Sequence, residues 1–135
     1  MITSKVVYLG ELRTKATHAN SGSEFITDAP TDNQGKGEAF SPTDLTATSL
    51  ASCMITIIGI KAKSMNLEIG QVEASVKKVM LGEPRRIGEI HIEMTISGQT
   101  YSEKEKQILI NAGLACPVAK SLHPEIKQYI SINFI

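Results

Sequence analysis

The chain has 135 residues, a formal net charge of zero at pH 7, a 41% hydrophobic fraction and no tryptophan. This length suits a single domain over residues 1–135 with an aliphatic core, and the absence of a basic block argues against a nucleic-acid partner. The N-terminal segment lacks the apolar run of a signal peptide, so we expect a cytoplasmic protein with no membrane partner, in which a structural disulfide is rare.

The N-terminal third of the chain predicts two strands and a loop. Residues 4–16 alternate in polarity as a strand does, and the Asn-Ser-Gly turn signal at residues 20–22 precedes a short strand over residues 24–27. We expect these two strands to pair as a hairpin. Residues 28–40 are rich in Gly, Asp, Asn and Pro, which indicates a loop.

Residues 41–63 predict one long helix. Ser41 is a suitable cap, Pro42 suits the first helical position, and Asp44 can complete a capping box. Residues 45–60 carry no charge, but this run is shorter than the roughly 20 residues of a membrane span. We therefore expect a helix buried in a protein core.

This helix has two unlike halves when its residues are placed at about 100° each. One half is aliphatic. The other half is small and rich in hydroxyl groups, and it carries Cys53 beside Ser49, Ser52 and Thr56. Another backbone, a substrate or a partner subunit can approach such a surface closely.

The remainder of the chain predicts an α+β order of strands and helices. Residues 72–81 and 87–97 alternate as strands, with a bulge near Lys78 and Val79. The second of these strands has one apolar and one polar face, which is typical of an antiparallel sheet with one face in water.

The last predicted elements are two helices and a strand. Ser102 and Glu105 form a capping box for a helix that ends at Gly113. A short helix with Pro117 at its first position follows, and residues 126–135 alternate as a final strand. The complete order is β-β-α-β-β-α-α-β, an α+β domain.

Cys53 and Cys116 are the leading candidates for chemistry. Free cysteine is among the most buried residue types, so two inert thiols are one interpretation. A redox pair is the other, because Cys116 directly precedes a helix start, where free N–H groups stabilise a thiolate. That argument alone makes Cys116 the more acidic thiol. A metal site is a weaker alternative, since no Cys and His spacing matches a zinc pattern.

Three motifs together resemble the superfamily of osmotically inducible protein C (OsmC) and organic hydroperoxide resistance protein (Ohr): SPTDL at residues 41–45, LASC at 50–53 and ACP at 115–117. The resemblance covers nearly the whole chain, including the order of elements. It implies antiparallel sheets wrapped around a long cysteine-bearing helix, in an intertwined homodimer with active sites at the subunit interface.

The resemblance also implies a thiol-dependent peroxidase that reduces small organic hydroperoxides to alcohols and needs no metal, haem or other cofactor. Cys53 would attack the peroxide and become a sulfenic acid. Cys116 would resolve this acid to a disulfide, which an external dithiol reduces.

One position departs from the family's peroxidase pattern. Peroxidase members pair an Arg with a Glu ten positions before the first cysteine, and that position is Thr43 here. Arg13 is the best candidate activator, although it could equally be a surface charge, and Asp44 and Glu38 are the nearest carboxylates. The departure leaves open a non-catalytic OsmC-like binding or interaction protein, or a thiol enzyme acting on another small electrophile.

Overall fold

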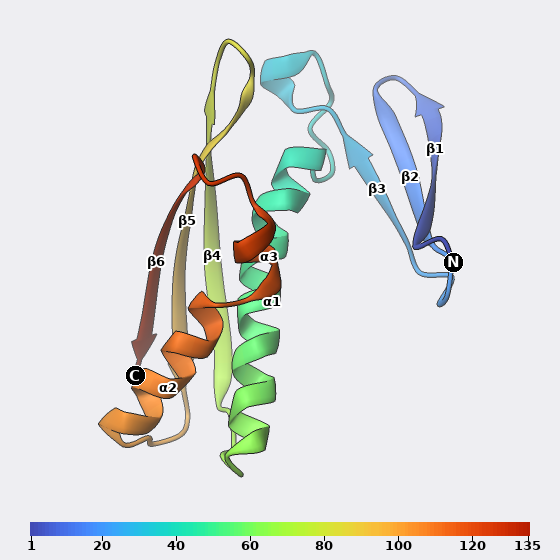
Figure 1. Ribbon diagram of the computed structural model, residues 1–135. Helices are drawn as coiled ribbons and strands as arrows, with labels where there is room; N and C mark the ends of the chain where they lie inside the picture. Colours follow the sequence, from blue (N-terminus) through green and yellow to red (C-terminus); the bar gives the residue numbers. More distant parts are fainter. The chain divides into compact units, whose positions relative to one another are not determined.

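The computed structural model describes residues 1–135 and combines helices with sheets, which confirms the predicted α+β class. The chain divides into two compact units, Met1–Thr46 and Ala47–Ile135, and each unit contains a three-stranded sheet. Figure 1 labels the helices and strands of both units. The assignment of residues 1–135 to a single domain stays a prediction.

The first unit is built on an antiparallel sheet of three strands: β1 (Ser4–Gly10), β2 (Arg13–His18) and β3 (Glu24–Asp28). The loop after β3 contains the short 3-10 helix η1 (Thr31–Asn33). The predicted single strand over residues 4–16 is wrong, because the chain reverses between β1 and β2 at Glu11 and Leu12. Both residues have a positive φ, 55° and 62°, in a turn conformation that normally recruits Gly or Asn.

The helix α1 (Pro42–Ser64) forms as predicted, within one residue at each end. A capping box closes its N-terminus: the Asp44 backbone N–H donates to Ser41 Oγ, and the Ser41 backbone N–H donates to Asp44 Oδ2, both at 3.0 Å. From Ala47 onward the apolar side of α1 is buried in the core of the second unit. By length and composition alone α1 could cross a membrane, a criterion that the core helix of a soluble protein also meets.

The second unit contains a mixed sheet of three strands in the order β4 (Gln71–Leu81), β5 (Arg86–Ser97) and β6 (Lys127–Phe134). β4 and β5 are antiparallel, and a register shift between Val79 and Met80 confirms the predicted bulge to within one residue. β6 runs parallel to β5. The prediction of antiparallel sheets is therefore wrong for this last strand.

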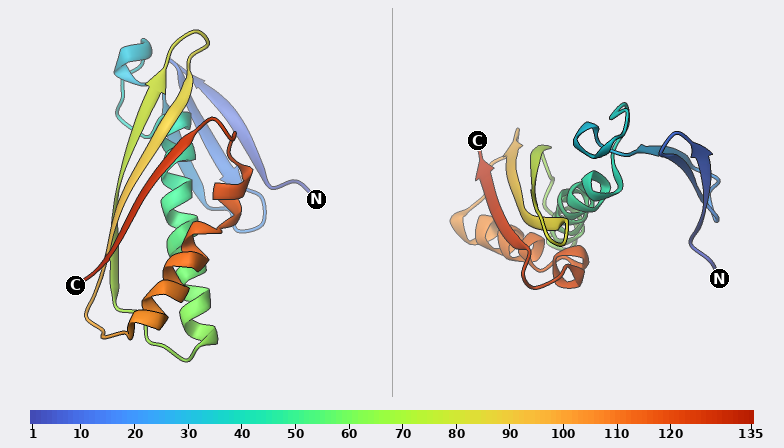
Figure 2. Two further views of the ribbon diagram at one scale, coloured as in Figure 1. Left: turned by 60° about the vertical axis from the view of Figure 1, so that its left-hand side comes forward. Right: turned by 90° about the horizontal axis from the view of Figure 1, so that it is seen from above.

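Two helices, α2 (Glu103–Leu114) and α3 (Pro117–Ser121), connect β5 to β6. This crossover returns the chain to the end of the sheet where β5 starts, which is why β6 pairs in parallel. Figure 1 and the left view of Figure 2 show α2 and α3 on the same face of this sheet as α1. Towards that face β5 buries the alternating apolar residues that the sequence predicted, Ile90, Ile92, Met94 and Ile96.

Gly113 lets α2 pack closely on α1. The sequence predicted it as the residue that ends α2, but the helix continues to Leu114 and its C-cap is Ala115. Gly113 is buried, and a Cβ atom added there would lie 2.9 Å from Cδ1 and 3.1 Å from Cγ1 of Ile58. The predicted C-cap is wrong because this glycine serves the contact between two helices rather than a turn.

We expect Gly113→Val to destabilise the protein by about 1–3 kcal/mol, because the added side chain overpacks the contact with Ile58. Urea denaturation of the two proteins measures this difference. The control is Lys104→Val, which adds the same side chain to an exposed position of α2 and should change stability by about 0.5 kcal/mol or less. Equal losses in both variants would contradict the role of Gly113 in packing.

Candidate functional site

The two cysteines lie close together in the second unit. Cys53 is on α1 and is half-buried, while Cys116, which precedes α3, is completely buried. Both are free thiols, Cys53 packs against the core cluster that contains Cys116, and the nearby Cys53 side chain influences the pKa of Cys116. The fold therefore brings together the two predicted thiols from distant parts of the chain.

Cys116 caps α3, which has Pro117 at its start as predicted. Burial raises the pKa of the Cys116 thiol above its ordinary value, the Ala119 backbone N–H that donates to Sγ at 3.4 Å opposes this rise, and the neighbouring Cys53 adds to it. The expectation of an acidic Cys116 is therefore wrong. Loss of water around the sulfur outweighs the N–H groups of a helix of only five residues.

The small and hydroxyl-bearing half of α1 lies next to an open groove. Ser52 and Thr56 are exposed on this half. A cavity of about 330 Å³ is lined by residues of α1 and β4, namely Thr48, Ala51, Ser52, Ile55, Thr56, Ala74 and Val76. Cys53 is not among the lining residues, so the cavity leaves room beside the helix without forming a pocket around the thiol.

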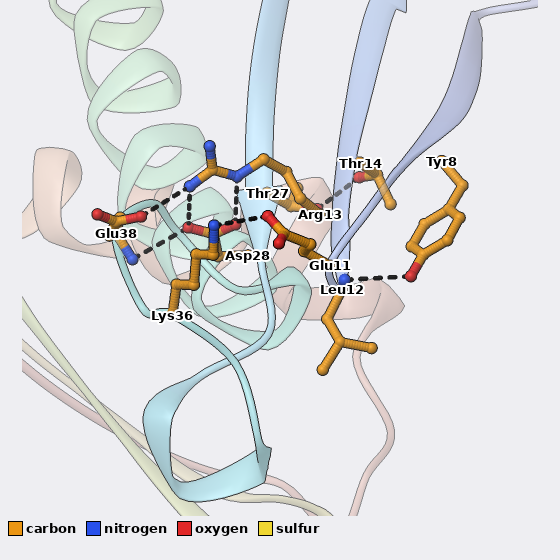
Figure 3. A network of polar contacts seen from close by, with 9 residues as sticks. All are labelled: Tyr8, Glu11, Leu12, Arg13, Thr14, Thr27, Asp28, Lys36 and Glu38. Atoms are coloured by element: carbon orange, nitrogen blue, oxygen red, sulfur yellow. Dashed lines mark hydrogen bonds and ion pairs between the residues drawn. The ribbon is translucent and has the colours of Figure 1, made fainter.

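A second cluster surrounds the Arg13 guanidinium in the first unit (Figure 3). Arg13 Nε donates to Asp28 Oδ1 at 2.7 Å, and Nη2 donates to Asp28 Oδ2 at 2.9 Å and to Glu38 Oε1 at 3.1 Å. The register of β2 and β3 places Arg13 directly opposite Asp28, while Glu38 belongs to the loop between η1 and α1. The pairing of Arg13 with Asp28 therefore follows from the sheet itself.

The three side chains of this cluster differ in their exposure to water, and the charges of Arg13 and Asp28 stabilise each other. Asp28 is completely buried, whereas the side chain of Glu38 is 66% exposed and that of Arg13 is 32% exposed. The hydrogen bond from Arg13 holds the pKa of Asp28 below its usual range against the opposing effect of burial, and the Glu38 backbone N–H lowers it further. The Asp28 carboxylate in turn raises the pKa of Arg13. Both side chains therefore stay charged.

The structure brings Arg13 and Glu38, two of the predicted site residues, into contact. Asp44 lies in the capping box of α1, as predicted from the sequence. Asp28 is absent from the residues predicted from the sequence, because it was assigned to the start of a loop. Asp28 could have been identified as a carboxylate at the end of β3 that lies opposite Arg13. That inference requires the position of the turn at Glu11, because the turn sets the register of the strands.

No group of three or more His, Cys, Asp or Glu side chains is arranged to hold a metal ion. His91 lies on the polar face of β5, as the alternation of that strand predicted. Its Nε2 atom lies 2.7 Å from Glu89 Oε1, and its ring stacks on Tyr129 with 4.7 Å between the centroids. These contacts engage His91 with its neighbours on the sheet.

Comparisons with known proteins agree with this architecture. A family model described as OsmC-like protein matches residues 35–131. A crystal structure from Psychrobacter arcticus 273-4, described as an osmotic stress induced and detoxification response protein, is 59% identical, covers 98% of this chain and 96% of its own, and has a TM-score of 0.92. No curated protein sequence matches the chain.

More distant solved structures share the fold alone. An organic hydroperoxide resistance protein OsmC from Legionella pneumophila is 15% identical over 98% of both chains, with a TM-score of 0.76. The organic hydroperoxide resistance protein OhrB of Bacillus subtilis is 20% identical, covers 97% of this chain and 98% of its own, and has a TM-score of 0.66. These matches confirm the OsmC-like fold that the sequence motifs predicted.

The family model spans both halves of the thiol pair, α1 with Cys53 and the start of α3 with Cys116. Its match extends over most of the chain, and the Psychrobacter structure matches nearly all of it. The chain therefore belongs to the OsmC-like family.

Proposed function

We propose that this protein is a cysteine-based peroxidase that reduces organic hydroperoxides to alcohols, in the cytoplasm and with an external dithiol as reductant. The observation that carries the proposal is that Cys53 and Cys116 are neighbours in the core of the second unit, in a member of the OsmC-like family. Structures that share its fold include proteins named for organic hydroperoxide resistance.

The proposed reaction has three steps that balance. The Cys53 thiolate attacks the terminal peroxide oxygen, the O–O bond breaks, and the departing alkoxide takes a proton to become the alcohol. The Cys116 thiol then attacks the Cys53 sulfenic acid, so that an S–S bond forms and water leaves with the Cys116 proton. An external dithiol reduces this disulfide by exchange and becomes oxidised itself.

The settings of the two thiols suit different parts of this sequence. Cys116 is completely buried and burial raises its pKa, so it stays protonated and does not compete for the peroxide. Cys53 is the more exposed sulfur and is the one that a substrate can reach. Because both cysteines lie in the same packed core, the resolving step does not require distant parts of the fold to meet.

Arg13 is the cation that we assign to the activation of Cys53. Its charge is secured by Asp28, which raises its pKa, and its Nη1 atom is engaged by neither Asp28 nor Glu38 (Figure 3). Two carboxylates, Asp28 and Glu38, therefore accept hydrogen bonds from Arg13, and neither occupies the position of the family's Glu, which is Thr43 here. Asp44 already caps α1, and we assign it no chemical step.

The first activity prediction compares the wild-type protein with Cys53→Ser. With cumene hydroperoxide and dithiothreitol, the wild type should consume peroxide catalytically, whereas Cys53→Ser should fall to the rate without protein. Peroxide consumption is followed directly. Cys116→Ser is the matched control, since it should keep the first oxidation and lose sustained turnover. Equal rates for wild type and Cys53→Ser would end the peroxidase proposal.

The second prediction concerns the product of the resolving step. One equivalent of hydroperoxide should link Cys53 to Cys116 in an intrachain disulfide, a bond that requires Cα atoms roughly 4.4–6.8 Å apart. Mass spectrometry of a tryptic digest should show the linked peptides, and a dithiol should separate them. Sulfonic acid on Cys53 with an untouched Cys116 would remove the resolving role. Two unmodified thiols would favour a non-catalytic member or a thiol enzyme for another electrophile.

We also propose that the protein is a homodimer, with Arg13 acting within its own subunit or on the partner's thiol. A single chain exposes large apolar side chains on one face of β1 and β3, namely Val6, Tyr8 and Phe25, and monomeric proteins rarely expose large apolar patches. Light scattering at micromolar concentration should therefore give twice the 14.6 kDa of one chain.

The control for the dimer is a change on the same strand. Val6→Lys places a charge among the exposed apolar residues and should raise the dissociation constant of the dimer, whereas Lys5→Gln should not. A wild-type protein that scatters as a 14.6 kDa particle would contradict the proposal.

A further inference from the structure

The two carboxylates that bind Arg13 hold it in unequal ways. Asp28 binds the side of the guanidinium through Nε and Nη2, from a completely buried position. Glu38 accepts only from Nη2, at 3.1 Å, and its side chain is 66% exposed. In Figure 3 Asp28 lies directly against the guanidinium, and Glu38 approaches it from the loop.

We propose that Asp28 is the positioning residue for Arg13, and that Glu38 is an exchangeable partner that gives way when the site acts. The proposal rests on the proposed function, since it takes Arg13 as the cation that serves Cys53. In this chain Asp28, on β3, would supply the fixed carboxylate that Thr43 cannot supply.

The geometry of the two hydrogen bonds supports a fixed orientation. A carboxylate that accepts from Nε and Nη2 together determines the plane of the guanidinium, which a single contact does not. Asp28 is itself held in place, because the Glu38 backbone N–H donates to its Oδ2 at 3.0 Å and the register of β3 sets its backbone. Arg13 therefore presents its remaining N–H groups in one direction.

The Glu38 contact has the properties of an exchangeable one. An exposed ion pair contributes little to stability, because water competes for both partners. Glu38 occupies only the Nη2 half of the outer edge formed by Nη1 and Nη2. Its departure would leave both nitrogens of that edge free to donate to a thiolate or a peroxide oxygen, while Asp28 continues to hold the opposite side.

Charge gives a second reason for the exchange. One guanidinium with two carboxylates carries a net charge of −1, and such a cluster does not favour a thiolate beside it. Without Glu38 the pair of Arg13 and Asp28 is neutral, and its outer N–H groups still point outward. The proposed activation of Cys53 therefore depends on the direction of these donors.

The test separates positioning from charge, because each variant removes one negative charge. Charge alone predicts that Asp28→Asn and Glu38→Gln both make Cys53 more reactive. Positioning predicts opposite outcomes: Asp28→Asn lowers the rate of Cys53 alkylation by iodoacetamide at pH 7 by about tenfold or more, and Glu38→Gln leaves it equal or higher. The measurement uses the Cys116→Ser background, so that Cys53 is the thiol that reacts.

A double-mutant cycle shows whether Asp28 acts through Arg13. In an Arg13→Met background, Asp28→Asn should cause no further loss, within about twofold. The profile of alkylation rate against pH should shift in the same direction for Arg13→Met and for Asp28→Asn. The control is Glu24→Gln, which removes a carboxylate of β3 from an exposed ion pair with Lys15 at 3.5 Å and should change nothing.

Each outcome decides one part of the proposal. Independent losses from Arg13→Met and Asp28→Asn, or a gain of reactivity in Asp28→Asn, would overturn the positioning role. Circular dichroism checks that each variant folds. If Asp28→Asn is unfolded, Asp28→Glu replaces it, because it keeps the negative charge and changes the position of the carboxylate. A folded Asp28→Glu that reacts as fast as the wild type, while Arg13→Met is impaired, also overturns the positioning role. Alkylation requires no peroxide, so a protein that fails only the hydroperoxide assay loses the proposed function while the coupling of Asp28 to Arg13 is still decided.

Discussion

The close packing of α2 on α1 at Gly113 is the constraint on which the thiol pair depends. A Cβ atom at Gly113 would lie against Ile58 and 3.8 Å from the carbonyl oxygen of Met54, the residue after Cys53. α2 therefore meets α1 beside the first thiol, and the chain leaves α2 immediately after this contact. Cys116 follows in the turn after α2, where its backbone N–H donates to the Gly113 carbonyl oxygen at 3.2 Å, so the contact helps to place Cys116 in the core.

Features that depend on neighbouring residues were predictable from the sequence. The capping boxes at Ser41 and Ser102 and the alternation of β5 are local patterns, and the structure confirms each of them. Features set by distant contacts were not predictable. Alternation gives the faces of β6 but not its direction, and the turn at Glu11 and Leu12 has positive φ without a glycine or asparagine to indicate it.

Among the candidate site residues, those marked by local motifs were predictable and those that depend on distant contacts were not. The motifs around Cys53 and Cys116 point to both thiols, but the predicted direction of the Cys116 pKa was wrong, because burial is a property of the packed unit. Arg13 and Glu38 were identified as candidates separately, and only the register of β2 and β3 reveals Asp28 between them. A charge that is completely buried cannot be inferred from a segment whose composition indicates an exposed loop.

Burial acts in opposite ways on Cys116 and on Asp28, each considered within its own unit. At Cys116, exclusion of water keeps a thiol neutral. At Asp28 the same exclusion favours a neutral acid, but the hydrogen bonds from Arg13 outweigh it. If Arg13 moved away from Asp28, the buried Asp28 carboxylate would be left without a partner. The Arg13 guanidinium therefore stays paired with Asp28. The proposed role of the cluster therefore rests on the direction of the remaining N–H groups of Arg13, which Asp28 determines.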